Sequence, residues 1–187
     1  MTIMVLARNW WMMAIRGGLA VLFGTSILLW TNQSLSTVVL LFGTYALLDG
    51  IWAIATATRA SEHPLEAWPV GLEGIVSVVL GLVALVWPFI SRELIYLIAG
   101  WGVVTGVLEI VAALRLPRET TGHWLLGTGG VCSLSLAVFV LILPHADIRP
   151  VATTLGTYAI LFGVLVGLAA CRFRQGHGAM WARAAGA

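Results

Sequence analysis

Residues 11–30, WMMAIRGGLAVLFGTSILLW, are apolar except for Arg16 and short hydroxyl side chains, and tryptophan stands at both ends. An α-helix needs about 20 apolar residues to cross a hydrocarbon core of about 30 Å, and tryptophan favours the headgroup level. The stretch therefore predicts a transmembrane helix. We expect it to be retained, because it contains an arginine and lacks the small-residue cleavage site of a signal peptide.

Five further stretches of the same kind follow along the chain. The six predicted spans are 11–30, 37–57, 69–87, 94–113, 124–143 and 151–170. The polar segments between them alternate short and long, which predicts three helical hairpins, each closed by a short turn and joined to the next by a longer loop. We expect an all-α integral membrane protein with six transmembrane helices, forming one membrane domain over residues 1–187 with a short C-terminal tail over 172–187.

The composition excludes most other classes of protein. The chain is 60% hydrophobic and 10% charged with a mean hydropathy of +0.99, whereas soluble domains carry about 25% charged residues. A soluble enzyme, a secreted domain and a disordered chain are therefore excluded. A net charge of +2 is too small for capture of nucleic acid, and no nucleic-acid partner is expected. Two distant cysteines and four scattered histidines offer no metal-ligand spacing, so we expect neither a metal nor another cofactor.

The arginines predict the orientation of the spans. Seven of them lie in the N-terminal segment, the two longer loops and the tail, namely Arg8, Arg59, Arg115, Arg118, Arg172, Arg174 and Arg183. Only Arg92 and Arg149 lie in the short turns. Because loops with more arginine stay in the cytoplasm, both termini are expected to be cytoplasmic.

Aligning Trp11, Trp68 and Trp124 reveals an internal repeat. The three copies cover about residues 8–60, 66–116 and 122–174. Glycines recur in a fixed register within the copies, and small residues seven apart lie on one helix face, where they let two backbones approach closely. We therefore predict helix-packing positions at Gly17, Gly24, Gly43, Gly50, Gly74, Gly81, Gly100, Gly130, Gly156 and Gly163.

The most distinctive pattern is Trp11-x4-Arg16-Gly17-x6-Gly24-x5-Trp30, followed by Gly43-Thr44-Tyr45-x3-Asp49-Gly50, with Trp87-Pro88 and Leu143-Pro144 repeating the turn. Over about residues 8–174 it resembles the HdeD family of bacterial acid-resistance membrane proteins, which is built from short repeats of a domain of unknown function. The third copy departs from the pattern at Gly129, where the first two have a charge. The resemblance implies a non-enzymatic, multi-pass protein of the bacterial inner membrane, linked to acid stress or envelope protection.

Four ionisable residues lie within the predicted spans, all in the cytoplasmic half: Arg16, Asp49, Glu73 and Glu109. Such groups are costly in lipid and usually face the bundle interior. The first three each precede a packing glycine, which predicts a position at the edge of a helix contact. We expect Arg16 to pair with Asp49 as first choice and Glu73 as second, while Glu109 extends towards Arg115 and interfacial water.

The same four residues also allow a functional interpretation. One arginine faces three carboxylates, and a surplus carboxylate in a low dielectric beside like charge would take up a proton as the pH falls. The cluster would then act as a sensor or relay. A full transmembrane proton path is not expected, because the outer half of every span lacks ionisable side chains.

Three functions therefore remain open. The first is a non-enzymatic acid-stress protein that contacts membrane lipid. The second is a small channel or transporter for protons or a small solute, although spans without interior proline, apart from Pro69 at a helix start, differ from the broken helices of transporters. The third is an accessory subunit of a larger membrane complex, or a homo-oligomer, packed through its glycine faces.

Overall fold

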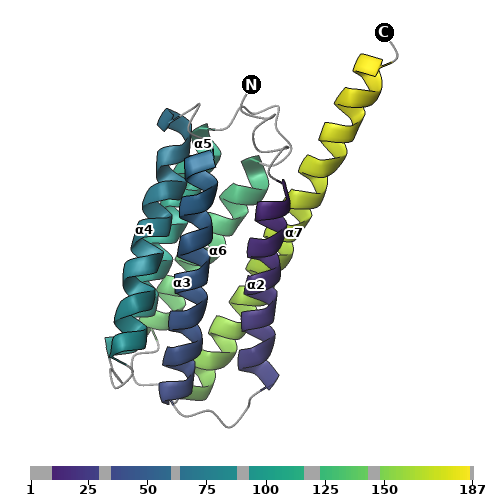
Figure 1. Cartoon of the computed structure of the whole chain (residues 1–187). Helices are drawn as coiled ribbons and strands as arrows, with labels where there is room; N and C mark the ends of the chain where they lie inside the picture. Colours follow the sequence, from purple (N-terminus) through teal and green to yellow (C-terminus); the bar gives the residue numbers. More distant parts are fainter. Residues whose placement is uncertain are drawn as a thin grey trace.

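The computed structural model describes residues 10–29, 35–59, 64–87, 93–115, 123–142 and 148–185. They form six helices: α2 (Trp10–Leu29), α3 (Leu35–Arg59), α4 (Pro64–Val86), α5 (Glu93–Arg115), α6 (His123–Ile142) and α7 (Ile148–Ala185). The prediction of six helices is confirmed. The helices run alternately up and down in a bundle, and α7 continues beyond the bundle at its upper end (Figure 1).

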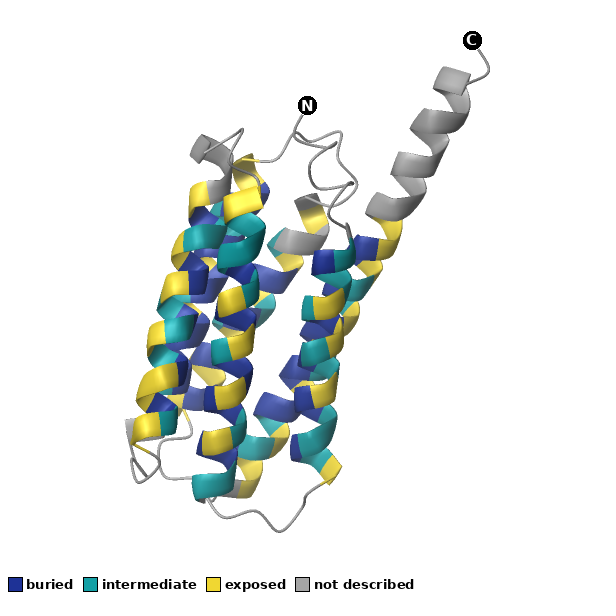
Figure 2. Ribbon diagram, viewed as in Figure 1, coloured by how far each residue is buried: buried dark blue, intermediate teal, exposed yellow. Residues whose placement is uncertain are grey.

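Five helices are long and apolar enough to cross a membrane. These stretches are Trp11–Leu29, Ser36–Arg59, Trp68–Val86, Tyr96–Arg115 and Arg149–Arg172. In α6 the apolar stretch among the described side chains is shorter, Gly127–Ile142. Buried residues face the bundle axis and exposed ones face outward (Figure 2). The outward side chains include Leu22, Ile75 and Val131, which are 64%, 54% and 56% exposed, so the bundle presents an apolar outer surface that suits lipid.

The closest helix packing joins α3 to α4, α5 to α6 and α7 to α2. Each of these pairs combines the second helix of one repeat with the first helix of another, and the pair of α7 with α2 closes the six helices into a ring. Helices joined by the short turns, such as α2 and α3, pack much less against each other. The three predicted hairpins are therefore not the units of packing.

Glycine faces explain this choice of partners. A Cβ atom added to Gly17 would lie 2.7 Å from the carbonyl oxygen of Gly163, and one added to Gly50 would lie 2.6 Å from that of Gly74. The remaining close contacts of this kind are Gly24 with Gly156, Gly43 with Gly81, and Gly106 with Gly130. Since Cβ atoms do not fit at these distances, only glycine allows the backbones to approach so closely.

Gly100 is the exception among the predicted packing glycines. A Cβ atom there would meet nothing within 4 Å, so the packing prediction is wrong at this position. Gly81 and Gly106 are 25 residues apart, whereas Gly24 and Gly50 are 26 apart. Because the second repeat is one residue shorter between its helices, the packing face of α5 carries Ala99, which is 2% exposed, seven residues before Gly106.

Candidate functional site: a buried arginine–carboxylate cluster

Arg16 of α2 contacts carboxylates from three other helices. Its Nε donates a hydrogen bond to Oδ1 of Asp49 at 2.6 Å, and its Nη2 donates to Oδ2 of Asp49 at 3.2 Å. Nη2 also pairs with Oε1 of Glu73 and lies 3.9 Å from Oε1 of Glu109. The two-pronged bond to Asp49 uses the planar fork of the guanidinium, which gives the strongest geometry for such a pair. Arg16 therefore binds both of its predicted partners at once.

The cluster lies inside the bundle. Asp49, Glu73 and Glu109 are 1%, 2% and 4% exposed, and the Arg16 side chain is 14% exposed. Arg16, Asp49 and Glu73 lie at the edge of the glycine contacts, on the side that faces the bundle axis. Each packing glycine faces the close partner helix in the ring, so the residue before it, about 100° around the helix, faces the bundle axis.

Glu109 does not extend towards Arg115 as expected. Its Oε2 accepts a hydrogen bond from the hydroxyl of Ser133 at 3.3 Å, and that hydroxyl lies 2.7 Å from the hydroxyl of Tyr158. A Cβ atom on Gly129 would lie 3.4 Å from the same Oε2. The departure of the third repeat at Gly129 thus leaves the space in which the carboxylate of Glu109 lies.

Arg16, Glu73 and Gly129 stand at the same position of the three repeats, five residues after Trp11, Trp68 and Trp124. The carboxylate of Glu109 lies next to Gly129, which has no side chain at this position. Phe162 of α7 covers another side of the guanidinium, with its ring centroid 5.5 Å from Cζ of Arg16. Every helix of the ring therefore contributes to the surroundings of the cluster.

The chain matches the model of a family described as a short repeat of unknown function, DUF308, over residues 15–76, 72–142 and 128–187. It belongs to the DUF308 family. The three matches confirm the internal repeat that the tryptophans predicted. No curated protein and no solved structure matches the chain.

The second helices of the three DUF308 repeats place an aromatic layer beneath the cluster. Tyr45, Trp101 and Tyr158 occupy equivalent positions and are 5%, 2% and 7% exposed. The Trp101 ring centroid lies 6.1 Å from that of Tyr45 and 6.5 Å from that of Tyr158. Trp101 Nε1 donates a hydrogen bond to Ser77 Oγ at 2.9 Å, so the polar edge of the largest ring is satisfied.

An apolar layer follows one helical turn further from the cluster. It consists of Phe42, Ile98 and Leu155, which are all buried to within 1%. Sequence reasoning did not single out either layer. The signal was nevertheless present, because both sets recur at the spacing of 56 and then 57 residues that relates Gly50, Gly106 and Gly163.

The arrangement offers ion pairing and proton exchange. Among the residues that the structure describes, no group of three or more His, Cys, Asp or Glu side chains is arranged to hold a metal ion. The cluster sets one guanidinium against three carboxylates, which lie on one side of the aromatic layer.

Proposed function

We propose that this DUF308 protein is a non-enzymatic, multi-pass protein of the bacterial inner membrane that responds to acid, as its resemblance to the HdeD family implies. The observation that carries the proposal is the charge balance of the cluster. Three carboxylates that are each at most 4% exposed face one guanidinium. Excess buried charge is costly in a membrane protein, and the excess grows as carboxylates lose protons at higher pH. Proton uptake by the cluster therefore lowers this cost.

Glu109 is the carboxylate best suited to take up the proton. Asp49 has a two-pronged bond to Arg16 and Glu73 has a direct ion pair, whereas Glu109 is 3.9 Å from the guanidinium. The titratable and charged groups around Glu109, from all the helices that bear on it, are Arg16, Tyr45, Asp49, Glu73 and Tyr158. Arg16 is the one cation among these groups, and it contacts Asp49 and Glu73 more closely than Glu109.

The proposal predicts an unusual pH dependence of stability. A folded chain that holds an extra proton at Glu109 binds more protons than the unfolded chain, so its stability falls as the pH rises. In the range above about pH 4.3, the ordinary pKa of a glutamate, the free energy of unfolding should fall by up to about 1.4 kcal/mol per pH unit. Thermal melts of the purified protein in detergent would measure this slope.

The variant Glu109→Gln should flatten the slope and raise the stability at the upper end of the range. Ser133→Ala is the matched control, because it removes the hydrogen bond to Glu109 without changing a charge. A slope that is unchanged in Glu109→Gln would show that another group binds the proton. In a bacterium that lacks the gene, the wild-type chain should restore survival of acid challenge and Glu109→Gln should not.

The orientation of the chain is a second part of the proposal, with both termini in the cytoplasm. It is supported by the positions of Arg59, Arg115 and Arg172 at the upper end of the bundle and of Arg149 at the other. Reporter fusions after residues 32, 62, 90, 119, 147 and 187 would test it. Cytoplasmic signals are expected at 62, 119 and 187, and a periplasmic signal at either of the first two would contradict the orientation.

The alternative of a proton channel is less well supported. A channel needs polar groups or water along its whole length. Beyond the aromatic layer, the buried core side chains that the structure describes are apolar, and Phe42, Ile98 and Leu155 are among them. We therefore propose that protons exchange only at the end of the bundle nearer the cluster, which the proposed orientation puts in the cytoplasm.

A further inference from the structure

Each repeat carries an arginine whose guanidinium lies over a tryptophan ring. Cζ of Arg59 lies 5.4 Å from the ring centroid of Trp11. The other two pairs are Arg115 with Trp68 at 5.3 Å and Arg172 with Trp124 at 5.6 Å. Each pair joins the first and second helices of one repeat, which pack only sparsely elsewhere.

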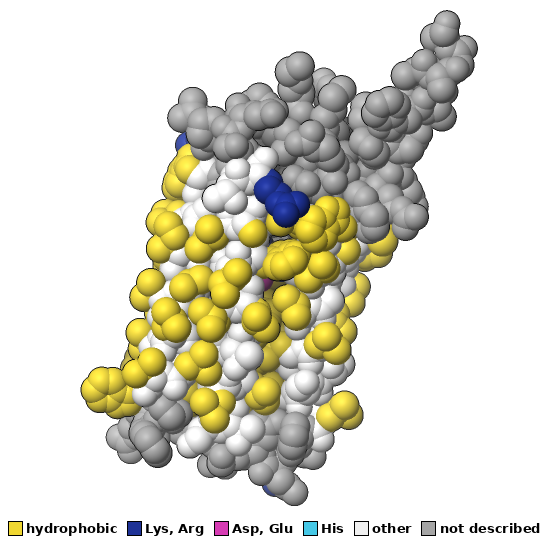
Figure 3. Space-filling view, viewed as in Figure 1, with side chains coloured by type: hydrophobic (Ala, Val, Ile, Leu, Met, Phe, Trp, Pro, Cys, Tyr) yellow, Lys and Arg dark blue, Asp and Glu magenta, His cyan; other side chains and the backbone are white. Residues whose placement is uncertain are grey.

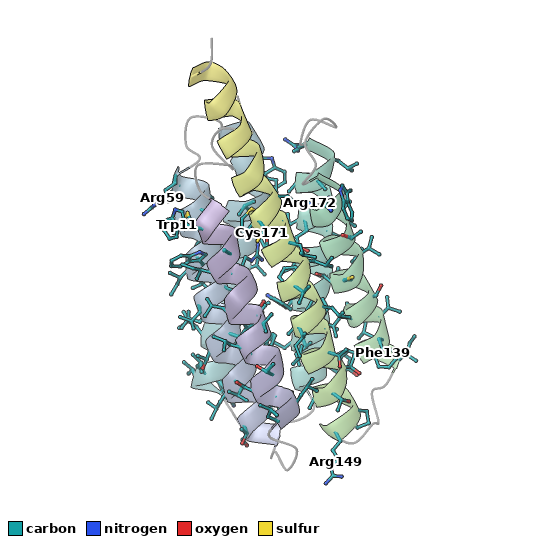
Figure 4. The ribbon with its side chains drawn as sticks, turned by 90° about the vertical axis from the view of Figure 1, so that its right-hand side faces the viewer. Trp11, Arg59, Phe139, Arg149, Cys171 and Arg172 are labelled. Atoms are coloured by element: carbon teal, nitrogen blue, oxygen red, sulfur yellow. The ribbon has the colours of Figure 1, made fainter. Side chains whose placement is uncertain are left out.

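The three pairs lie at the same end of the bundle. Each tryptophan is near the start of α2, α4 or α6, and each arginine is at the end of the membrane-spanning part of α3, α5 or α7. Figure 4 shows Arg59 beside Trp11 and Arg172 at this end, with Arg149 at the opposite end. The space-filling view shows a basic side chain at the upper margin of the apolar surface (Figure 3). If the apolar surface faces lipid, the headgroup layer begins at this margin.

The arginines are placed to bind from outside the bundle. All three are exposed, as are Trp68 and Trp124, which are 41% and 45% exposed. A guanidinium carries five N–H groups in one plane, and contact with a ring face does not use them all. Because those N–H groups match two oxygens of a phosphate, each pair presents an anion-binding edge at headgroup depth.

We propose that the three Arg–Trp pairs are equivalent binding sites for the phosphate of an anionic phospholipid. Tryptophan holds each arginine at the level of the headgroups, and the negative charge of such lipids attracts basic residues there. The lipid bridges the two helices of a repeat at the end where the short turns do not connect them. This inference does not depend on the acid response of the buried cluster.

Native mass spectrometry of the detergent-purified protein would test the inference by counting bound lipids. With phosphatidylglycerol as the probe, the wild-type chain should bind three molecules in preference to phosphatidylcholine of the same acyl length. Each of Arg59→Gln, Arg115→Gln and Arg172→Gln should remove one of the three, with affinity at that site falling about fivefold. The triple variant should lose the preference between the two lipids.

Arg149→Gln is the matched control, because Arg149 is also exposed but lies at the other end of the bundle. It should retain all three bound phosphatidylglycerol molecules. The inference is overturned if the triple variant keeps its preference, or if Arg149→Gln loses as much binding as the other single variants. It is also overturned if inorganic phosphate displaces the lipid, since the sites would then take a soluble anion. Substitutions at exposed positions have small effects on stability, so the variants are expected to fold.

Discussion

Replacing Arg16 with alanine is expected to lower the free energy of unfolding by about 3–5 kcal/mol, because it leaves buried carboxylates without their cation. Asp49 and Glu73 both bind the guanidinium directly and are 1% and 2% exposed. The loss of unfolding free energy should therefore be several times larger than the loss caused by replacing an exposed arginine. Thermal or denaturant unfolding in detergent would measure it, with Arg149→Ala as the control that should change stability by no more than about 0.5 kcal/mol.

Two double-mutant cycles would identify the partners. The pair Arg16→Ala with Asp49→Ala should be less destabilised than the sum of its single variants, and so should Arg16→Ala with Glu73→Ala. Groups in direct contact typically show coupling of about 0.5–3 kcal/mol. Coupling to neither carboxylate would mean that the contacts do not contribute to stability, and Arg16 would have no structural partner.

Leucine at Gly24 or Gly81 is expected to destabilise the bundle by about 3 kcal/mol or more, or to abolish the folded yield. A Cβ atom on Gly24 would lie 2.5 Å from the carbonyl oxygen of Gly156, and one on Gly81 would lie 2.6 Å from the backbone nitrogen of Leu47. Since the obstructing atoms belong to the backbone, the two helices would have to separate. The fraction of protein that elutes as a folded species in detergent would report the effect.

Gly100→Leu is the matched control, because Gly100 lies in α5 and a Cβ atom there meets nothing within 4 Å. Its folded yield should equal that of the wild type. Equal yields for all three leucine variants would contradict the argument that close backbone approach holds the ring together.

Hydropathy and repeat spacing were sufficient to predict the six helices and the three repeats. They also predicted the contact of Arg16 with Asp49, because few ionisable groups occur within the spans and a buried arginine needs a carboxylate at similar depth. The partners of the helices were beyond this reasoning. A stripe of glycines indicates a packing face without saying which helix covers it. The short loop between α2 and α3 therefore predicts close packing of these two helices, and this prediction is wrong.

The remaining errors have local causes. The packing prediction at Gly100 is wrong because it applies the same residue spacing to all three repeats. The second repeat is one residue shorter between its helices. The expectation that Glu109 extends towards Arg115 and interfacial water follows from its shallow position in the predicted span. Its actual surroundings, Ser133 and the space beside Gly129, come from α6, and a contact between helices of different repeats leaves no trace in local spacing.

The packing of α7 against α2 has a consequence for biosynthesis. A membrane protein leaves the ribosome from its N-terminus, so α3 can meet α4, and α5 can meet α6, as soon as each second member is made. Helix α2 cannot complete its packing until α7 is made, because Gly17 and Gly24 pack against the backbone of Gly163 and Gly156. Until then the ring of helices around Arg16 is not closed. Helix α2 is thus made before its partner by the length of four intervening helices, and translation of α7 is the event that closes the ring.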